Sequence, residues 1–237
     1  MQHPPSANLA RISEIFSSLQ GEGTHVGERH LFIRFEECHI RCQYCDELEK
    51  VGTPMTLDDV MTEVGRLERE EGPHAYVSLT GGEPLLYLEF LKPLMIRLKA
   101  ERFRIYLETN GILWRALEEV IGWVDVAAMD MKPASVTQEK NFDEEHRRFL
   151  EIAKAKETLV KIILSKDIDV QEFEHEIRII AGLAPDTPLI LQPLSCGGEG
   201  HEDPDLMQLL EHLQRVALRS LRRVQIVPRF HRILKIR

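Results

Sequence analysis

The sequence predicts a single α/β domain whose sheet is mainly parallel. Short apolar segments of strand character alternate along the chain with amphipathic segments of helical spacing, as in right-handed βαβ units. We count six or seven such strands, one or two fewer than the eight that close a full barrel. No linker composition, internal repeat or low-complexity tract divides the 237 residues, so one domain is the economical interpretation.

Each expected element has its own signal. Residues 31–35 (LFIRF) read as the first strand, with Arg34 facing opposite its neighbours. Thr56 lies three residues before Asp59, as in a capping box, and apolar residues then recur at helical spacing as far as Leu67. Further strands are expected at 75–79, 103–107, 124–131, 159–165, 188–194 and 223–228. Further helices are expected at 85–98 (with Pro93 as a possible kink), 112–122, 142–155, 170–181 and 204–217.

The composition excludes several classes of protein. An apolar content of 43% with 29% charged residues is typical of a globular chain with a substantial core. The net charge of -9 argues against a protein that coats nucleic-acid phosphates, and the basic stretch 215–223 is more simply a solvated face. No apolar run reaches the roughly 18 residues that cross a bilayer, and the first residues lack the pattern of a secretory signal. We therefore expect a cytoplasmic protein that binds neither nucleic acid nor membranes.

Three of the four cysteines lie within eight residues, at positions 38, 42 and 45. Clustered thiols in a cytosolic chain more often bind metal or do redox work than form disulfides. Three thiolates on a short loop can hold three irons of a [4Fe–4S] cluster, which leaves the fourth iron open to a non-protein ligand. Structural zinc completed by Cys196 or His39 is the alternative, although the second Cys-x2-Cys arm of most zinc sites is missing. The spacing favours the iron–sulfur site, and Cys196 is most simply a free thiol.

Five turns that resemble ligand-binding motifs follow five of the expected strands. They are the cysteine loop, TGGEP (80–84), ETNG (108–111), DMKP (130–133) and QPLS (192–195). Parallel strands end at one edge of a sheet, where the ligand sites of α/β folds collect. Each turn alone is also ordinary turn chemistry, so only their combination indicates a site.

The cysteine spacing, with Tyr44 directly before the last cysteine, resembles the signature of the radical S-adenosylmethionine (SAM) superfamily. The glycines of TGGEP resemble that family's GGE motif, in which the main chain comes close to the ligand. The resemblance implies a [4Fe–4S] cluster on Cys38, Cys42 and Cys45, SAM bound at the open iron, and a 5′-deoxyadenosyl radical that abstracts hydrogen. The fold that it implies is a partial, six-stranded parallel βα barrel.

A narrower resemblance covers nearly the whole chain. The segment EIFSSLQGEGTHVGERHLFIRF (14–35), together with LTGGEPLL, LETNG, LQPLS and the closing VPRFHRILKIR, is similar to the 7-carboxy-7-deazaguanine synthase family. This similarity implies conversion of 6-carboxy-5,6,7,8-tetrahydropterin to 7-carboxy-7-deazaguanine with loss of ammonia, a step of queuosine and other 7-deazapurine pathways. It also implies a homodimer and a flavodoxin- or ferredoxin-type reductant. Within the domain it implies a substrate-facing segment at 12–30, a cluster loop at 36–47 and a pocket-closing segment at 224–237.

The same resemblance implies a role for individual residues. Glu108 and His231 are expected to be catalytic. The residues expected to face the substrate are Leu19, Gln20, Gly21, Glu22, Arg34, Thr80 and the terminal carboxylate of Arg237. Arg34 would meet the substrate carboxylate, to which its fork of donors is suited. The residues expected to hold SAM are Tyr44, Gly82, Glu83, Asp130, Met131, Lys132, Gln192, Pro193, Leu194 and Ser195.

The chain also departs from the family pattern. Asp46 and Glu47 follow the last cysteine, where the family usually has a Thr or Ser that ligates Mg²⁺. Magnesium prefers oxygen ligands, and Glu47 offers one with a longer reach and a full negative charge. Three explanations fit this departure: the metal is held by other ligands, the substrate is another heterocycle, or the enzyme does not use magnesium. Glu47 as a solvated loop carboxylate, with no ligand role, is an equally good interpretation of the sequence. Glu37 replaces a common glycine, and Arg229-Phe230 replaces a more polar pair.

Two further functions stay open at this point: a radical SAM activase that acts on a partner protein, and a zinc-stabilised binding protein. The QGEG segment and the closing RFHRILKIR resemble small-molecule pocket elements and disfavour the activase. Purification without oxygen distinguishes a zinc site from an iron–sulfur cluster. We expect brown protein whose charge-transfer absorption bleaches on reduction. Colourless protein with stoichiometric zinc would contradict the iron–sulfur assignment.

Overall fold

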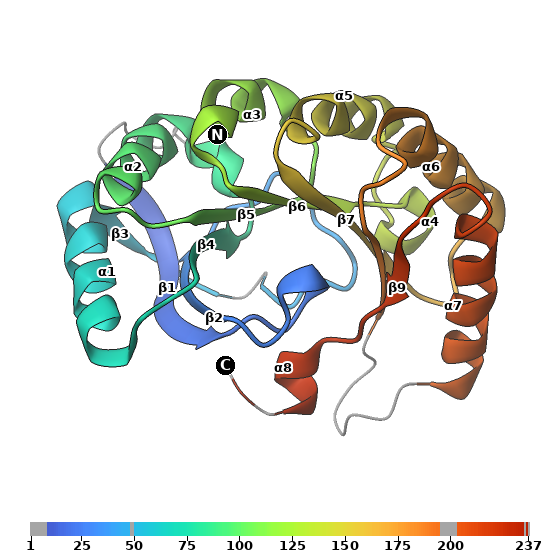
Figure 1. The fold of residues 1–237 in the computed structure, drawn as a ribbon, viewed down its shortest axis with the longest axis horizontal. Coiled ribbons are helices and arrows are strands. Elements are labelled where there is room, and N and C mark those ends of the chain that lie inside the picture. Colours follow the sequence, from blue (N-terminus) through green and yellow to red (C-terminus); the bar gives the residue numbers. More distant parts are fainter. Residues whose placement is uncertain (1–8, 48–49, 195–202, 235, 237) are drawn as a thin grey trace.

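The computed structural model describes residues 9–47, 50–194, 203–234 and 236, and in this part of the chain all strands join one curved sheet (Figure 1). The strands are β1 (Leu9–Leu19), β2 (Arg29–Phe35), β3 (Thr53–Thr56), β4 (Tyr76–Gly81), β5 (Ile105–Thr109), β6 (Val126–Met131), β7 (Glu157–Leu164), β8 (Leu189–Pro193) and β9 (Val224–Ile226). Their order is β3-β1-β2-β4-β5-β6-β7-β8-β9. From β2 onward, neighbouring strands are parallel and follow chain order.

The predicted α/β class with a mainly parallel, open sheet is confirmed. Every strand expected from the sequence overlaps an observed one, and the short β9 makes the parallel set in the described residues seven strands wide. Two strands were not expected. β1 pairs antiparallel with β2 and with β3 at the edge of the sheet. The first part of the segment 12–30, to which the resemblance gave only a substrate-facing role, therefore also extends the sheet.

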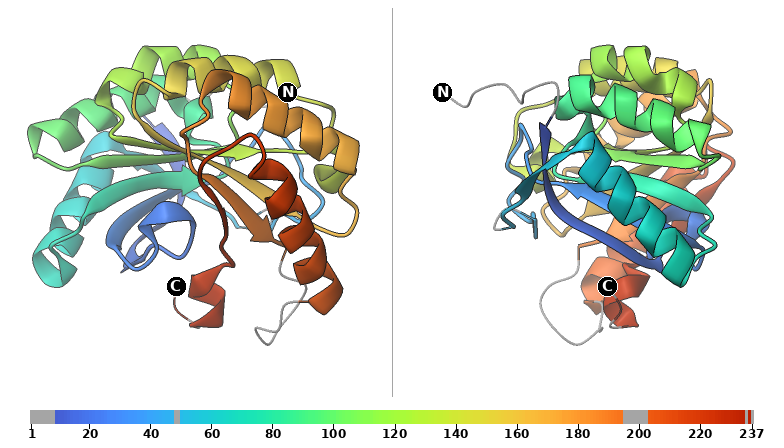
Figure 2. Two further views of the ribbon diagram at one scale, coloured as in Figure 1. Left: turned by 45° about the vertical axis from the view of Figure 1, so that its right-hand side comes forward. Right: turned by 90° about the vertical axis from the view of Figure 1, so that its left-hand side faces the viewer.

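The long helices cover the convex face of the sheet (Figures 1 and 2). The helices are α1 (Leu57–Glu71), α2 (Leu88–Ala100), α3 (Trp114–Val120), α4 (Ala134–Thr137), α5 (Asp143–Ala153), α6 (Val170–Leu183), α7 (Pro204–Ala217) and α8 (Phe230–Ile233). Short 3-10 turns are η1 (Gly23–His25), η2 (Pro84–Tyr87) and η3 (Ile121–Trp123). Thr56 caps α1 in the expected capping box with Asp59, and α2 continues through Pro93. None of the helices in the described residues is long and apolar enough to span a membrane.

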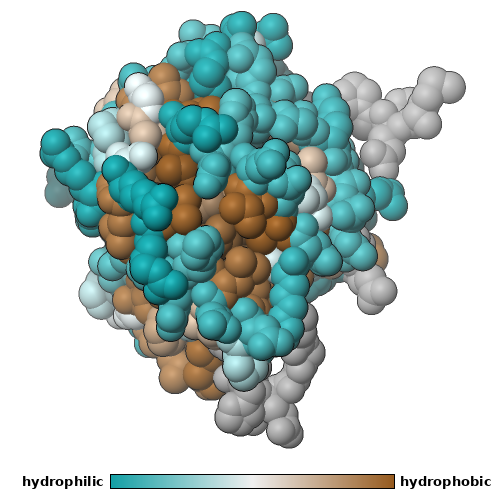
Figure 3. All heavy atoms as spheres, turned by 90° about the vertical axis from the view of Figure 1, so that its right-hand side faces the viewer, coloured by the Kyte–Doolittle hydropathy of each residue, from teal (hydrophilic) through white to brown (hydrophobic). Residues whose placement is uncertain are grey.

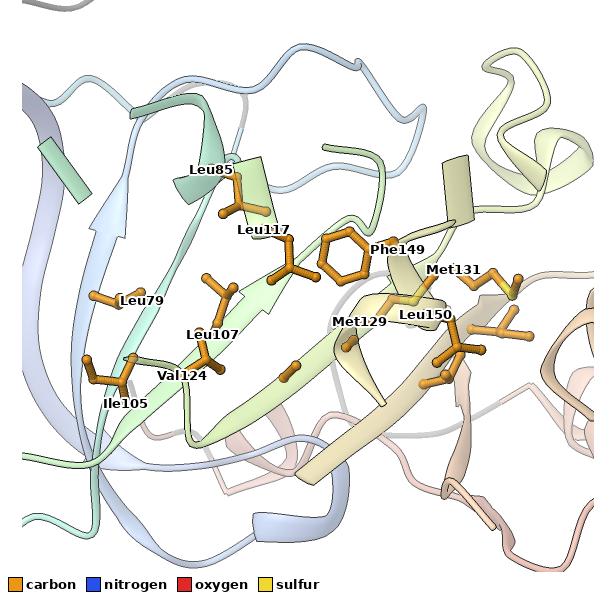
Figure 4. Packing of buried hydrophobic residues seen from close by; sticks show 14 of the residues in the cluster. Leu79, Leu85, Ile105, Leu107, Leu117, Val124, Met129, Met131, Phe149 and Leu150 are labelled. Carbon is orange, nitrogen blue, oxygen red and sulfur yellow. The ribbon is translucent and has the colours of Figure 1, made fainter. Parts of the chain in front are cut away.

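The core lies between the sheet and these helices. Leu79, Leu107 and Met129 of successive parallel strands belong to one buried cluster with Leu117 and Phe149 of the covering helices, and all five are fully buried (Figure 4). Strands buried in this way are rich in aliphatic residues rather than strictly alternating. Apolar surface also shows between the charged side chains of the face over α6 and α7 (Figure 3). Because helices cover the convex face of the sheet, a binding site can form only on its concave face or at the carboxyl ends of its strands.

A close backbone contact fixes the cysteine loop to the sheet. At the end of β4, the backbone N–H of Gly82 donates to the carbonyl of Phe35 (2.8 Å), and that of Glu83 donates to the carbonyl of Glu37 (2.7 Å). Gly81 has a φ of +117°, which side chains rarely adopt. A Cβ at position 82 would collide with the carbonyl group of Glu37. The two glycines are therefore required for the loop to lie against β4.

Gly82→Ala should destabilise the protein by about 1–3 kcal/mol, because the added Cβ forces the cysteine loop away from β4. Urea unfolding measures this difference. Gly122→Ala is the matched control, since a Cβ at that position in η3 meets no heavy atom within 4 Å. Equal unfolding midpoints for the two variants would show that the contact is not needed for stability.

Candidate active site

The carboxyl ends of the parallel strands surround a pocket of about 230 Å³. Residues from all five of the predicted turns line it, so the convergence expected from a parallel sheet is present. The lining residues that the sequence had singled out are Gln20, Glu22, Arg34, Cys38, Cys42, Tyr44, Cys45, Glu47, Thr80, Gly82, Glu108, Asp130, Lys132, Gln192, Leu194 and His231.

Other candidates lie elsewhere. Leu19, Gly21, Glu83, Met131 and Pro193 are described but do not line the pocket. Glu83 is fully buried beneath it, where its carboxylate accepts hydrogen bonds from the backbone of Asn110 and Leu85. The positions of Ser195, Cys196 and Arg237 lie outside the described residues.

The three described thiols line the same pocket and contact an apolar cluster formed by Ile40, Ile112 and Phe142. Burial raises the pKa of Cys38 to about 11 and also raises that of Cys42, so binding of a metal must displace their protons. Among the described residues, no three His, Cys, Asp or Glu side chains converge as the ligands of one ion do. The donor set of three thiols on one loop offers one thiolate to each of three irons and so fits a cubane cluster. His39 is exposed and does not line the pocket.

Lys132, Asp130 and Tyr44 form one wall beside the cysteine loop. The Lys132 ammonium donates to Asp130 Oδ2 (2.6 Å) and lies 3.4 Å from the Tyr44 hydroxyl. Burial alone would lower the pKa of Lys132, but the surrounding Asp130, Tyr44 and Cys42 outweigh it and keep the lysine charged. Asp130 Oδ1 and Gln192 Oε1 are buried without a hydrogen-bond partner among the described residues. Orphaned acceptors of this kind fit a ligand that brings its own donors, as SAM does with its amino and hydroxyl groups.

Beside this wall, Lys161 of β7 lies near the three carboxylates of Glu22, Glu108 and Asp130. Its ammonium pairs with Glu22 and lies 3.7 Å from Asp130. Burial alone would raise the pKa of Glu22, but Lys161, aided by His231 and Arg229, lowers it to about 2. The pKa of Glu108 is raised, chiefly by burial. Its two oxygens accept hydrogen bonds from Gln20 and Thr80, each at 2.9 Å, so these three candidates form one connected group.

Arg34 and Glu47 are joined directly, at 2.5 Å between Nη1 and Oε1. Glu14 lies 3.3 Å from the same nitrogen, and Lys50 contacts both carboxylates at 3.0 Å. Arg34 Nε and Glu47 Oε2 are buried without a hydrogen-bond partner in the described part of the chain. Glu47 is therefore part of the pocket rather than a solvated loop carboxylate, and it offers one unpaired oxygen.

The C-terminal segment packs against the first turn of the pocket. Phe230 N donates to the carbonyl of Gly21 (3.0 Å), and a Cβ at position 21 would lie 2.5 Å from His231 Nδ1. Asp46 accepts hydrogen bonds from Arg229 (2.8 Å) and Arg232. These arginines lower the pKa of Asp46 in spite of its burial, so the pairs are ionic near neutral pH. The segment thus contacts both the substrate-facing turn and the cysteine loop.

Comparison with protein families matches residues 32–163 to the radical SAM superfamily. A protein of Geobacter sulfurreducens named 7-carboxy-7-deazaguanine synthase is 36% identical over 95% of this chain and 97% of its own length. A protein of the same name from Methanopyrus kandleri is 32% identical over 94% of this chain and 92% of its own. The chain belongs to the 7-carboxy-7-deazaguanine synthase family of the radical SAM superfamily.

Two solved structures have the same fold. The crystal structure of QueE from Escherichia coli has a TM-score of 0.61 at 20% identity and covers 92% of this chain and 93% of that chain. Streptococcus suis SuiB bound to S-adenosylmethionine has a TM-score of 0.59 at 14% identity, over 81% of this chain and 48% of that one. Membership of a radical SAM family confirms the enzyme class and implies the [4Fe–4S] cluster and SAM. The comparisons favour neither the zinc protein nor the activase.

Several lining residues of this family member were missed, and Lys161 matters most. The register pairs it with Asp130 of the neighbouring strand. Ile163, two residues further along β7, also lines the pocket. Alternate residues of a strand point to the same face. This period of two along β7 was the signal that could have placed Lys161 on the pocket side, together with Ile163. Asn110, Asp46 and Arg229 also line the pocket. They lie in segments that the sequence predicted to form the site, but no individual role was predicted for them.

Lys161→Met should destabilise the protein by about 1–3 kcal/mol, because it leaves largely buried carboxylates without their cation. In a double-mutant cycle with Glu22→Gln, we expect a coupling above about 1 kcal/mol, measured by urea unfolding. The folded-state pKa of Glu22 is depressed from 4.5 to about 2. Its stabilisation is therefore present above pH 4.5 and is lost as the pH falls toward 2, so the coupling should shrink on acidification.

The exposed pair Lys166 and Asp205, 3.2 Å apart, is the control for this cycle. Its coupling should stay below about 1 kcal/mol. A Glu22–Lys161 coupling no larger than that of the control would contradict the buried ion pair.

Proposed function

We propose that this protein converts 6-carboxy-5,6,7,8-tetrahydropterin to 7-carboxy-7-deazaguanine with release of ammonia, as a lyase of queuosine or other 7-deazapurine biosynthesis. The observation that carries the proposal is the 36% identity to the Geobacter sulfurreducens protein, which extends over 95% of this chain. The convergence of the cysteine loop with Gln20, Glu22, Arg34 and Thr80, four of the predicted substrate residues, on one pocket supports it. A radical SAM enzyme that acts on another heterocycle is the remaining alternative.

The residues that would hold the cofactors are those of the cysteine loop and the wall beside it. Cys38, Cys42 and Cys45 would bind the cluster. Tyr44, Gly82, Asp130, Lys132, Gln192 and Leu194 would bind SAM. When bound, the reduced cluster and SAM together supply the radical that abstracts hydrogen from the substrate. The protein contributes positioning and exclusion of water.

Arg34 and the group around Glu108 would orient the pterin. Arg34 Nε is a buried donor without a partner among the described residues, and it is suited to the substrate carboxylate. Glu108 is a partly buried carboxyl in the pocket wall, and its raised pKa favours proton exchange with a ring nitrogen. Gln20 and Thr80 fix its orientation. Burial lowers the pKa of His231, so its imidazole is neutral near neutral pH and can both donate and accept a hydrogen bond.

Magnesium enters the proposal through Glu47. Its Oε1 is held by Arg34 and Lys50, whereas its buried Oε2 has no partner in the described residues. Magnesium commonly uses one or two protein carboxylates and completes its octahedron with substrate oxygens and water. Glu47 Oε2 would be the protein's ligand to the ion, in place of the usual hydroxyl oxygen.

The proposal also includes a homodimer, a flavodoxin- or ferredoxin-type reductant and a cytoplasmic location. Ile233, Leu234 and Ile236 near the end of the chain expose apolar surface that a second copy would cover, which supports the dimer. The reductant follows from the need for a low-potential electron donor to the cluster. The location is supported by the clustered rather than dispersed cysteines.

Reconstituted protein incubated anaerobically with dithionite, SAM and the carboxylated tetrahydropterin should form 7-carboxy-7-deazaguanine and ammonia without net loss of SAM. Liquid chromatography with mass detection measures product and SAM together. Cys42→Ala should abolish turnover, because one iron loses its thiolate.

Glu47→Gln should raise the Mg²⁺ concentration that gives half-maximal activity in the same assay, whereas Glu63→Gln on the outer helix α1 should not. SAM cleavage without product would contradict the pterin as substrate, and an unchanged response to Mg²⁺ would contradict Glu47 as its ligand.

A further inference from the structure

The turn that follows β5 places an amide beside the first cysteine. Asn110 is 5% exposed and lines the pocket. Its side-chain Nδ2 lies 3.8 Å from Cys38 Sγ, within the reach of an N–H···S hydrogen bond. The sequence singled out the turn ETNG and expected a role for Glu108 in it, but assigned none to Asn110.

The orientation of this amide is determined by its other contact. Asn110 Oδ1 accepts a hydrogen bond from the backbone N–H of Ile112 (3.2 Å). An amide carries its acceptor and its donors on opposite sides, so the side that faces the sulfur is the N–H side. The reverse orientation would leave the Ile112 N–H unsatisfied and would place an oxygen against the sulfur.

The backbone of Asn110 is held as firmly as its side chain. Its N–H donates to Glu83 Oε2 (2.8 Å), and its carbonyl accepts from His146 Nε2 (3.1 Å). Glu83 also accepts from the Thr109 hydroxyl at 2.9 Å. Gly111 follows with a φ of +70°, and a Cβ there would lie 2.8 Å from Met129. The buried carboxylate under the pocket therefore serves to position this turn.

The Cys38 sulfur also accepts a hydrogen bond from the backbone of Ile40, and the thiols of this loop pack against the apolar side chains of Ile40, Ile112 and Phe142. Asn110 therefore adds a side-chain donor to a sulfur that already has one backbone donor. Hydrogen bonds to the sulfurs of an iron–sulfur cluster are among the factors that set its reduction potential. A donor stabilises the reduced state more than the oxidised state, because reduction adds negative charge to the cluster and its thiolates.

We propose that Asn110 donates a hydrogen bond from Nδ2 to the Cys38 thiolate of the bound cluster and thereby raises the reduction potential of that cluster. Asn110 acts as a tuning residue that contacts a cluster ligand, and Glu83 and His146 act as its positioning residues. This inference rests on membership of the radical SAM superfamily and does not depend on the identity of the substrate.

Selective isotope labelling tests the contact in the unaltered protein. The chain contains three asparagines, Asn8, Asn110 and Asn141. Protein made with asparagine labelled with ¹⁵N at the side-chain amide should show a ¹⁵N hyperfine coupling to the reduced cluster in pulsed electron paramagnetic resonance. The coupling should disappear in Asn110→Ser and persist in Asn141→Ser. Its absence from the labelled wild-type protein would overturn the proposal.

Redox titration tests the consequence. Asn110→Ser keeps a side-chain oxygen for the Ile112 N–H but is too short to reach Cys38, so its midpoint potential should be more negative than that of the wild-type protein. Asn141→Ser is the matched control, because the amide of Asn141 donates to Asp143 on an exposed surface (2.8 Å). It should titrate like the wild type. Equal midpoints for Asn110→Ser and the wild type, at equal iron content, would overturn the proposal.

The titration and the labelling need only SAM-free, reconstituted protein. A negative result in the assay with the pterin would therefore not affect the titration or the labelling experiment. The proposed substrate and the proposed Asn110–Cys38 hydrogen bond can thus fail independently. Should Asn110→Ser fail to load iron, the coupling in labelled wild-type protein still decides the question.

Discussion

The site depends on the contact between two stretches of backbone, the end of β4 and the start of the cysteine loop. Hydrogen bonds from Gly82 and Glu83 to the carbonyls of Phe35 and Glu37 fix the loop at the rim of the sheet. The absence of a Cβ at position 82 permits this approach. Because the loop is anchored at its start, all three of its thiols face the same pocket as the ends of the other parallel strands.

Charge balance shapes the rest of the pocket. Lys132 is buried and Lys161 is largely buried, and each lies beside a carboxylate that compensates its charge. Isolated buried charges would be costly, so the pairing keeps the charged forms in place near neutral pH. Within the described residues, four of the seven buried side-chain polar atoms without a hydrogen-bond partner belong to the lining, namely Arg34 Nε, Glu47 Oε2, Asp130 Oδ1 and Gln192 Oε1. The pocket is thus internally neutralised and yet retains acceptors for a ligand.

Much of the fold could be predicted from the sequence because the βαβ units repeat a local signal. Strands such as 159–165 stand out as apolar runs, and the capping box at Thr56 marks the start of α1. β1 and β3 were missed because they lie at the antiparallel edge, outside this repeat. The cysteines and the turns were found from spacing, whereas Lys161 looked like a single polar residue in an apolar strand. The partners of Asp46 could not be predicted, because they come from the far end of the chain.

The contact of Asp46 with Arg229 joins positions 183 residues apart in sequence. During synthesis the ribosome therefore completes the cysteine loop long before the arginines that cover it. Contacts of such long range form late in folding, because the intervening chain must first be ordered. The link between the cysteine loop and the segment around α8 is therefore a contact that only an ordered sheet can bring together.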